Sequence, residues 1–148
     1  MNQIKITVFN LKNYFYLEPL SLQSKLQSFK SSIDEYTDYL LNDAKRSLND
    51  HIAKTWILSE KKTGNIAAYM SIIADAIKLS FAEKELHGLK YPFKTIPAMK
   101  IAKLAVDVTF AQKYKGLGTI MILAAQDIAY NLDNDYCEPL VFSPWMLT

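Results

Sequence analysis

Cysteine, arginine and histidine are scarce in this sequence, and each shortage narrows the chemistry open to the protein. Cys137 is the single cysteine, which excludes an internal disulfide and any zinc site built from cysteines alone. Arg46 is the single arginine, so bidentate guanidinium clamps on a phosphate are almost excluded. Neither His51 nor His87 has a second histidine at metal-binding spacing, and we therefore expect no metal site.

The sequence also lacks a long hydrophobic run. A membrane-spanning helix needs about 18 or more consecutive apolar residues, and no segment approaches that length. The first residues contain Asn2, Gln3 and Lys5, which interrupt the apolar stretch that a signal peptide requires. We expect a cytoplasmic protein without a membrane partner. With 148 residues, 50% of them hydrophobic, the chain is predicted to form a single domain over residues 1–148.

Positive and negative charges nearly balance in total, but they are unevenly distributed. The segment 84–115 contains seven lysines and only two acidic residues, Glu85 and Asp107. The segment 116–148 contains four acidic residues and neither lysine nor arginine. A basic middle segment suits an anionic ligand such as a phosphate group or a nucleic acid. It equally suits a solvated, lysine-rich surface, so a nucleic-acid-binding module stays one of the alternatives.

Hydrophobic periodicity and turn residues predict a chain of alternating strands and helices. Residues 17–30 are expected to form a short helix or a loop, and residues 81–97 a loop with one helical turn. Ser32 and Glu35 form a capping-box pattern at the start of a predicted amphipathic helix, 33–49. A second helix is predicted to begin at Gly116. Strands are predicted at 4–9, 55–60, 66–79, 100–108 and 139–142.

One segment has the composition of an anion-binding site. The predicted strand 100–108 leads to Lys113-Tyr114-Lys115-Gly116-Leu117-Gly118-Thr119, where a helix begins. Backbone amides at a helix start have no partners in the helix, and the helix dipole adds positive charge there. The glycines allow close approach of a bulky anion, so the segment predicts a diphosphate site. It is neither a Walker A loop nor a dinucleotide fingerprint. The alternative is that both glycines only make a tight turn.

Residues 100–107 followed by 113–119 resemble motif A of the GNAT acetyltransferases, whose pattern is Gln/Arg-x-x-Gly-x-Gly/Ala. Lys113 stands at the Gln/Arg position. The resemblance extends over about residues 25 to 142 and includes Ile96-Pro97-Ala98-Met99, as in a subgroup that contains toxins of toxin–antitoxin pairs. It implies an α+β fold with a mixed, mostly antiparallel β-sheet flanked by helices. It also implies a domain that is C-terminally short relative to the family and lacks the last strands of the family's sheet.

The resemblance implies that acetyl-CoA is the co-substrate, and it assigns residues to it. The pantetheine arm pairs with the backbone of Leu104 and Val106, and the acyl carbonyl points toward Leu104 and Ala105. The acceptor is an amine that attacks the thioester directly. It is a small molecule, a protein or an aminoacyl-tRNA, and the sequence does not distinguish these. The diphosphate lies on the amides of Lys113, Tyr114, Lys115, Gly116, Leu117, Gly118 and Thr119.

No catalytic residue follows from the sequence. The family's catalytic tyrosine comes after the strand that corresponds to 140–142, and residues 143–148 contain no tyrosine. Glu83, Glu85 and Asp107 are the nearest acids, and each is expected to be a solvated charge. Tyr69 is expected to pack in the core. The alternative function is a catalytically inactive binding or regulatory subunit. We also expect a homodimer or a partner chain at the C-terminal edge, covering the apolar residues Leu140, Val141, Phe142, Trp145, Met146 and Leu147.

Overall fold

The computed structural model describes residues 2–22, 24–88, 95–136 and 141–142, and it has mixed α and β elements. In chain order the elements are β1 (Ile4–Lys5), α1 (Leu11–Tyr14), β2 (Phe15–Pro19), α2 (Asp34–Asp38), the π-helical segment η1 (Tyr39–Asp43), α3 (Ala44–Asn49), β3 (Lys54–Glu60), β4 (Ile66–Lys78), α4 (Phe81–Leu86), β5 (Thr95–Val106), α5 (Val108–Lys113), β6 (Tyr114–Lys115), α6 (Leu117–Tyr136) and β7 (Val141–Phe142).

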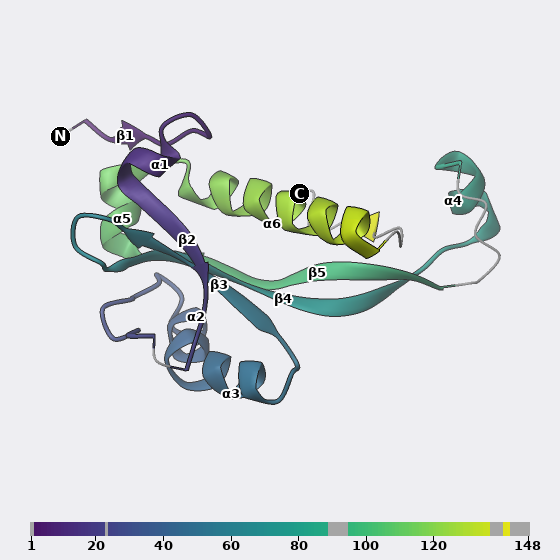
Figure 1. The fold of residues 1–148 in the computed structure, drawn as a ribbon, viewed down its shortest axis with the longest axis horizontal. Helices are drawn as coiled ribbons and strands as arrows, with labels where there is room; N and C mark the ends of the chain where they lie inside the picture. Colours follow the sequence, from purple (N-terminus) through teal and green to yellow (C-terminus); the bar gives the residue numbers. More distant parts are fainter. Residues whose placement is uncertain (1, 23, 89–94, 137–140, 143–148) are drawn as a thin grey trace.

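A five-stranded sheet in the order β2-β3-β4-β5-β7 forms the middle layer (Figure 1). Neighbouring strands are antiparallel from β2 to β5, and β7 lies parallel to β5. The predicted mixed, mostly antiparallel sheet flanked by helices is therefore confirmed. β1 and β6 form a separate parallel pair, which ties the N-terminal segment to the residues just before α6.

Two hydrophobic cores lie on the two faces of the sheet, because side chains alternate along each strand. Leu58 and Met70 are fully buried in the core that includes the inner face of α6. Their neighbours Ile57 and Tyr69 are buried in the core that includes Leu40 of η1. Consequently α6 covers one face of the sheet and the α2–α3 segment covers the other (Figure 1).

The longest strands, β4 and β5, continue beyond the body of the molecule as a hairpin arm. They pair from Ala68 and Val106 to Lys78 and Thr95, and α4 lies at the far end of the arm (Figure 1). The strand predicted at 66–79 is confirmed. β5 begins earlier than predicted, at Thr95, and α4 supplies the helical turn that was expected between residues 81 and 97.

The N-terminal predictions are partly wrong. The predicted strand 4–9 is limited to β1, because Thr7 donates its backbone N–H to the Asn10 side chain and starts a turn. Residues 15–19 form β2, where a helix or loop was expected from residue 17 on. Pro19 is compatible with this strand because β2 lies at the sheet edge and, among the described residues, pairs with β3 alone.

The predicted capping box at Ser32 and Glu35 is wrong. The helical segment begins after Ile33, whose N–H donates to the Ser31 hydroxyl, so the side-chain hydrogen bond comes one residue earlier than predicted. A capping box is present instead at α4, where Ser80 and Glu83 bond reciprocally. The predicted helix 33–49 is confirmed as helical from Asp34 to Asn49, although it is interrupted by the π-helical turn of η1.

Two further expectations concern the C-terminal strand and membrane-spanning helices. The strand predicted at 139–142 is observed as β7, and Pro139 and Leu140 lie outside the described residues, as do Trp145, Met146 and Leu147. In the part of the chain that the structure describes, no helix is long and apolar enough to cross a membrane.

Candidate functional site

The candidate site begins at the edge of β5 that faces away from β4. β7 pairs with this edge only at Ala98 and Met99. Beyond Met99, no strand among the described residues pairs with this edge as far as Val106. The β4–β5 register shifts here, because Lys103 lies opposite Ser71 and Ile101 lies opposite Ile72, which leaves Ala102 as an extra, bulged residue. The backbone of this stretch is therefore open to an extended ligand.

The three β5 residues predicted to hold the acyl-pantetheine arm keep their side chains on the two faces of the sheet. Leu104 and Val106 are half-buried against the core beneath α6, whereas Ala105 is buried in the opposite core with Tyr69. The backbone groups of these residues are therefore the ones directed along the sheet toward a ligand at the strand edge. The predicted role, which asks for main-chain hydrogen bonds to the ligand, stays a prediction.

Asp107 ends β5 and begins α5, and the structure corrects the expectation that it is a solvated charge. It is buried, and its Oδ1 accepts hydrogen bonds from the backbone N–H groups of Thr109 (2.8 Å) and Phe110 (3.3 Å). Its Oδ2 accepts from the Lys30 N–H at 2.8 Å. With both oxygens engaged by backbone, Asp107 is an N-cap that fixes α5 between β5 and the glycine segment.

The predicted diphosphate segment has a more regular structure than a loop. Lys113 lies in the last turn of α5, and the Tyr114 N–H donates to the Phe110 carbonyl, so that amide is already engaged. The first helical bond of α6 runs from the Ile120 N–H to the Gly116 carbonyl. The amides of Leu117, Gly118 and Thr119 precede it and have no partner within α6. They are the part of the predicted segment best placed for an anion.

The two glycines of the segment have different roles. Gly116 has a φ of +95°, and a Cβ at this position would lie 3.0 Å from the Ile6 carbonyl oxygen of the adjacent segment. Glycine is thus required there by backbone conformation and by the contact with the N-terminal segment. Gly118 is helical, and a Cβ there would meet nothing within 4 Å. The space beside Gly118 is therefore open.

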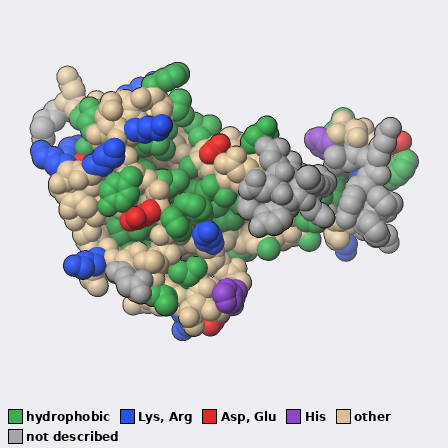
Figure 2. Space-filling model, viewed as in Figure 1, with side chains coloured by type: hydrophobic (Ala, Val, Ile, Leu, Met, Phe, Trp, Pro, Cys, Tyr) green, Lys and Arg blue, Asp and Glu red, His purple; other side chains and the backbone are tan. Residues whose placement is uncertain are grey.

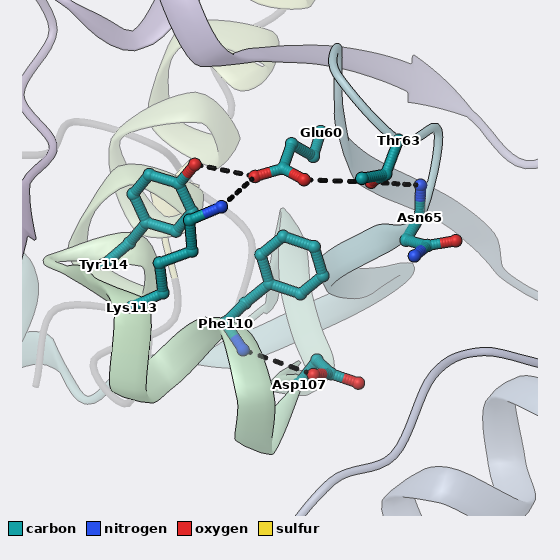
Figure 3. Close-up of polar contacts among 7 residues, drawn as sticks. All are labelled: Glu60, Thr63, Asn65, Asp107, Phe110, Lys113 and Tyr114. Atoms are coloured by element: carbon teal, nitrogen blue, oxygen red, sulfur yellow. Dashed lines mark hydrogen bonds and ion pairs between the residues drawn. The ribbon is translucent and has the colours of Figure 1, made fainter.

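A buried carboxylate, Glu60, supports this segment (Figure 3). No local pattern of residues in the sequence points to it. Glu60 ends β3 and is only 3% exposed. Its Oε2 accepts a 2.6 Å hydrogen bond from the Tyr114 hydroxyl and lies 3.2 Å from Lys113 Nζ. Its Oε1 accepts from the Thr63 hydroxyl at 2.9 Å. The network joins the β3–β4 turn to the end of α5 and to β6.

The protonation states in this network follow from burial and hydrogen bonding. Burial raises the pKa of Glu60, but the hydrogen bonds from Tyr114, Thr63 and Lys113 outweigh it, so the pKa lies below its usual value. Burial and the bond to Glu60 raise the pKa of Tyr114. The hydrogen bond to Glu60 also raises the pKa of Lys113. At neutral pH, therefore, Glu60 is ionised, Tyr114 is a neutral donor and Lys113 is cationic.

Lys113 belongs to the predicted anion-binding segment, and the structure directs its ammonium to Glu60. Lys103 is likewise paired, with Glu35 at 3.2 Å. Part of the basic character of segment 84–115 is thus neutralised within the molecule. Basic side chains gather in Figure 2 at the end of the molecule that carries β1, α1 and α5. A cavity of about 330 Å³ at this end is lined by Lys61, Lys62, Lys113, Glu60, Tyr14, Tyr114, Ile4 and Asn13.

We expect the Glu60 network to stabilise the fold in a pH-dependent way. Because the folded state lowers the pKa of Glu60, its contribution is fully present above about pH 4.5 and is lost as the pH falls through the folded-state pKa. Urea unfolding from pH 7 to pH 3 tests this with Glu60→Gln as the control, since glutamine does not titrate. The stability difference between the two proteins should shrink in acid, and a constant difference would contradict the assignment.

The two acids of α4 lie far from the glycine segment, and Tyr69 lies in the core. Glu83 belongs to the capping box of α4, and Glu85 is exposed on the same helix, at the far end of the arm from α5 (Figure 1). Tyr69 is fully buried, as expected, and its hydroxyl donates to the Tyr36 carbonyl at 2.6 Å. Among residues 2–22, 24–88, 95–136 and 141–142, no group of three or more His, Cys, Asp or Glu residues is arranged to hold a metal ion.

Comparison with known proteins identifies the fold. No protein-family model matches the sequence, and no curated protein sequence matches it. Solved structures do match, and they show that the chain shares the fold of toxin acetyltransferases of the GNAT type, as the resemblance in motif A predicts.

Several of the matching structures are of AtaT and KacT. AtaT complexed with acetyl-methionyl-tRNAfMet has a TM-score of 0.74 and 17% identity, covering 86% of this chain and 76% of its own. A Tyr-to-Phe mutant of KacT has a TM-score of 0.69 and 15% identity, with coverages of 82% and 72%. AtaTR bound with acetyl-CoA has a TM-score of 0.68 and 17% identity, with coverages of 83% and 72%. A Tyr-to-Phe mutant of AtaT has also been solved bound to the C-terminus of the antitoxin AtaR.

Proposed function

We propose that this protein is an acetyl-CoA-dependent N-acetyltransferase. Two features of the described residues together carry the proposal. The edge of β5 is unpaired beyond Met99, and the amides at the start of α6 have no partner within the helix. An extended, amide-containing arm can add to the strand edge, and a diphosphate can accept hydrogen bonds from the helix start. Acetyl-CoA contains both groups, joined in one molecule.

The residues present fit this ligand. The backbone of Leu104 and Val106 would hold the pantetheine arm, and the acyl carbonyl would lie near Leu104 and Ala105. The amides of Leu117, Gly118 and Thr119 would hold the diphosphate, and the 20-residue α6 gives these amides the positive end of a long helix dipole. The open space at Gly118 lets the diphosphate approach the backbone. Lys115 is exposed beside them and adds positive charge.

The reaction that follows from such an arrangement is a direct transfer. The nitrogen of a neutral amine attacks the thioester carbonyl carbon, the C–S bond breaks, and the sulfur leaves with the electron pair and takes a proton. A cationic amine therefore gives an amide, free coenzyme A and one released proton. The edge position of the thioester leaves its carbonyl accessible to an acceptor from the α2–η1 side. The catalytic acid and base stay unassigned.

Two measurements test the proposal. Calorimetric titration with coenzyme A should show binding, and thiol release from acetyl-CoA should then rise when a suitable amine is added. Binding without turnover across small amines, lysine-containing peptides and aminoacyl-tRNA would favour the alternative, an inactive binding or regulatory subunit. Absence of coenzyme A binding would overturn both.

The acceptor and the partner chain are the finer parts of the proposal. A small amine, a protein amine and aminoacyl-tRNA are the candidate acceptors, and the AtaT structure with acetyl-methionyl-tRNAfMet supports including the last of these. A partner polypeptide is supported by the AtaT structure with the C-terminus of AtaR. A homodimer is the other possibility. Size-exclusion chromatography with light scattering at tens of micromolar distinguishes them, and a clean monomer would count against the homodimer.

A further inference from the structure

A cluster of two tyrosines and one carboxylate holds the ammonium of Lys103 on the α2–η1 side of β5. Lys103 Nζ lies 5.2 Å from the ring centroid of Tyr36 and 5.3 Å from that of Tyr39. Its third partner is Glu35, whose Oε1 is 3.2 Å away. Two aromatic faces and a carboxylate are the groups that recognise an alkylammonium ion. We call Glu35, Tyr36 and Tyr39 the ammonium cluster.

Two backbone irregularities meet at this cluster. The π-helical turn of η1 begins at Tyr39, within an otherwise α-helical segment. The β-bulge of β5 lies at Ala102, immediately before Lys103. Bulges of both kinds redirect side chains away from the regular pattern, and both are frequent at functional sites. Their coincidence is more than surface packing of a lysine requires.

Buried residues of the core hold the ammonium cluster in place. The Tyr69 hydroxyl donates to the Tyr36 carbonyl at 2.6 Å, and the Tyr69 ring stacks on Tyr39 with centroids 6.2 Å apart. Phe29 packs edge-on against Tyr69 at 5.2 Å. The aromatic faces are therefore positioned by the core before any ligand arrives, which lowers the entropic cost of binding.

The cluster is also open to solvent on one side. The side chain of Glu35 is 75% exposed and that of Lys103 is 23% exposed, while both tyrosines are half-buried. Lys103 directly precedes Leu104 and Ala105, beside which the thioester is proposed to lie. An ammonium group bound in this cluster would thus be near the reacting carbonyl, on the side of the sheet that α2 covers.

We propose that the ammonium cluster recognises the ammonium group of the acceptor. In the free protein, Lys103 Nζ occupies the place of that ammonium and leaves when the acceptor binds. This inference rests on the proposed acetyl transfer and adds to it the residues that recognise the acceptor. An alkylamine and a lysine side chain present the same chemistry, so free amine and peptide are compared as sources.

The experiment titrates protein labelled at tyrosine ring carbons with n-butylammonium chloride and with a lysine-containing peptide, followed by NMR. n-Butanol serves as the neutral analogue. Tyr36 and Tyr39 signals should move with the ammonium and not with butanol. Lys103→Ala should tighten ammonium binding by about fivefold or more, because the competing internal cation is gone, and Glu35→Gln should weaken it by about fivefold.

A matched control removes a lysine–aromatic contact elsewhere. Lys54 Nζ lies 5.0 Å over the Trp56 ring, which packs against the core on the other face of the sheet. Lys54→Ala should leave ammonium binding unchanged. If Lys103→Ala fails to fold, Lys103→Met keeps the apolar stem without the charge. Glu35→Gln, at an exposed position, gives an independent route to the same answer.

Three results would overturn the inference. Ammonium binding that is unchanged in Lys103→Ala and Glu35→Gln would show that the cluster only tethers α2 to β5. Binding of a short RNA hairpin at low salt that is lost in Lys103→Ala would show that Lys103 serves an anion. If the enzyme is active, an unchanged KM for the amine in Lys103→Ala and Glu35→Gln would show that the cluster does not bind the acceptor. Ammonium binding without thiol release would instead keep the inference and overturn only the proposed reaction.

Discussion

Gly118→Trp is expected to abolish coenzyme A binding while leaving the fold intact. Gly118 lies in the first turn of α6, and the space beside it is open, because a Cβ at this position would have no neighbour within 4 Å. An indole there occupies the volume in which a diphosphate would approach the amides of Leu117 to Thr119. Calorimetric titration should show that the affinity falls by about a hundredfold or more, which corresponds to about 2.7 kcal/mol.

Two variants control this result. Tyr130→Trp places an indole at a 65% exposed position farther along the same helix and should leave coenzyme A binding unchanged. Gly118→Ala should raise the free energy of unfolding by about 0.5–1 kcal/mol, because alanine favours a helix over glycine. If Gly118→Trp is folded and still binds coenzyme A as tightly as the parent protein, the diphosphate lies elsewhere and the proposed site is wrong.

Glu60→Ala is expected to lower the free energy of unfolding by about 2–4 kcal/mol. The substitution removes the acceptor of the Tyr114 hydroxyl, which is buried, and the partner of the Thr63 hydroxyl. Lys113 adds little to the loss because its ammonium is half-exposed and can be solvated. Urea unfolding at pH 7, followed by circular dichroism, measures the change.

The matched variant is Glu60→Gln, which keeps an acceptor for Tyr114 and removes the charge. It should cost about 1–2 kcal/mol, less than Glu60→Ala, because the hydroxyl keeps a neutral hydrogen bond. Tyr114→Phe should cost about 1 kcal/mol, since a single hydrogen bond is lost without a change of shape. Equal stability of the parent protein and Glu60→Ala would show that this network does not hold the segment before α6.

Sequence patterns predict the elements whose signals are local. The strand 66–79 and the strand 55–60 on either side of the turn at Gly64 follow from β-rich residues and a turn that needs a positive φ. β2 is not predicted because Pro19 suggests a loop, and only its edge position makes proline acceptable there. The capping box is misplaced because Ser32 and Ser31 offer the same hydroxyl one residue apart.

The candidate site divides in the same way. The glycine segment can be found from the sequence because its residues are contiguous, and Gly116 has the positive φ for which glycine is suited. The ion-pair partner of Lys113 cannot be found from the sequence, because Glu60 is 53 residues away in the chain. The burial of Asp107 is equally hidden, because nothing local shows that the Lys30 backbone reaches its carboxylate.

The sequence by itself determined the class of fold and the place of the helix start that offers unpartnered amides, because strand alternation, helical periodicity and glycine placement are properties of neighbouring residues. Only the tertiary structure decided which charges are already paired, which strand edge stays open among the described residues, and that Lys103 lies over Tyr36 and Tyr39 beside a carboxylate 68 residues away. Those facts depend on strand register, on the β-bulge at Ala102 and on the π-helical turn of η1. These features arise only when distant segments pack together.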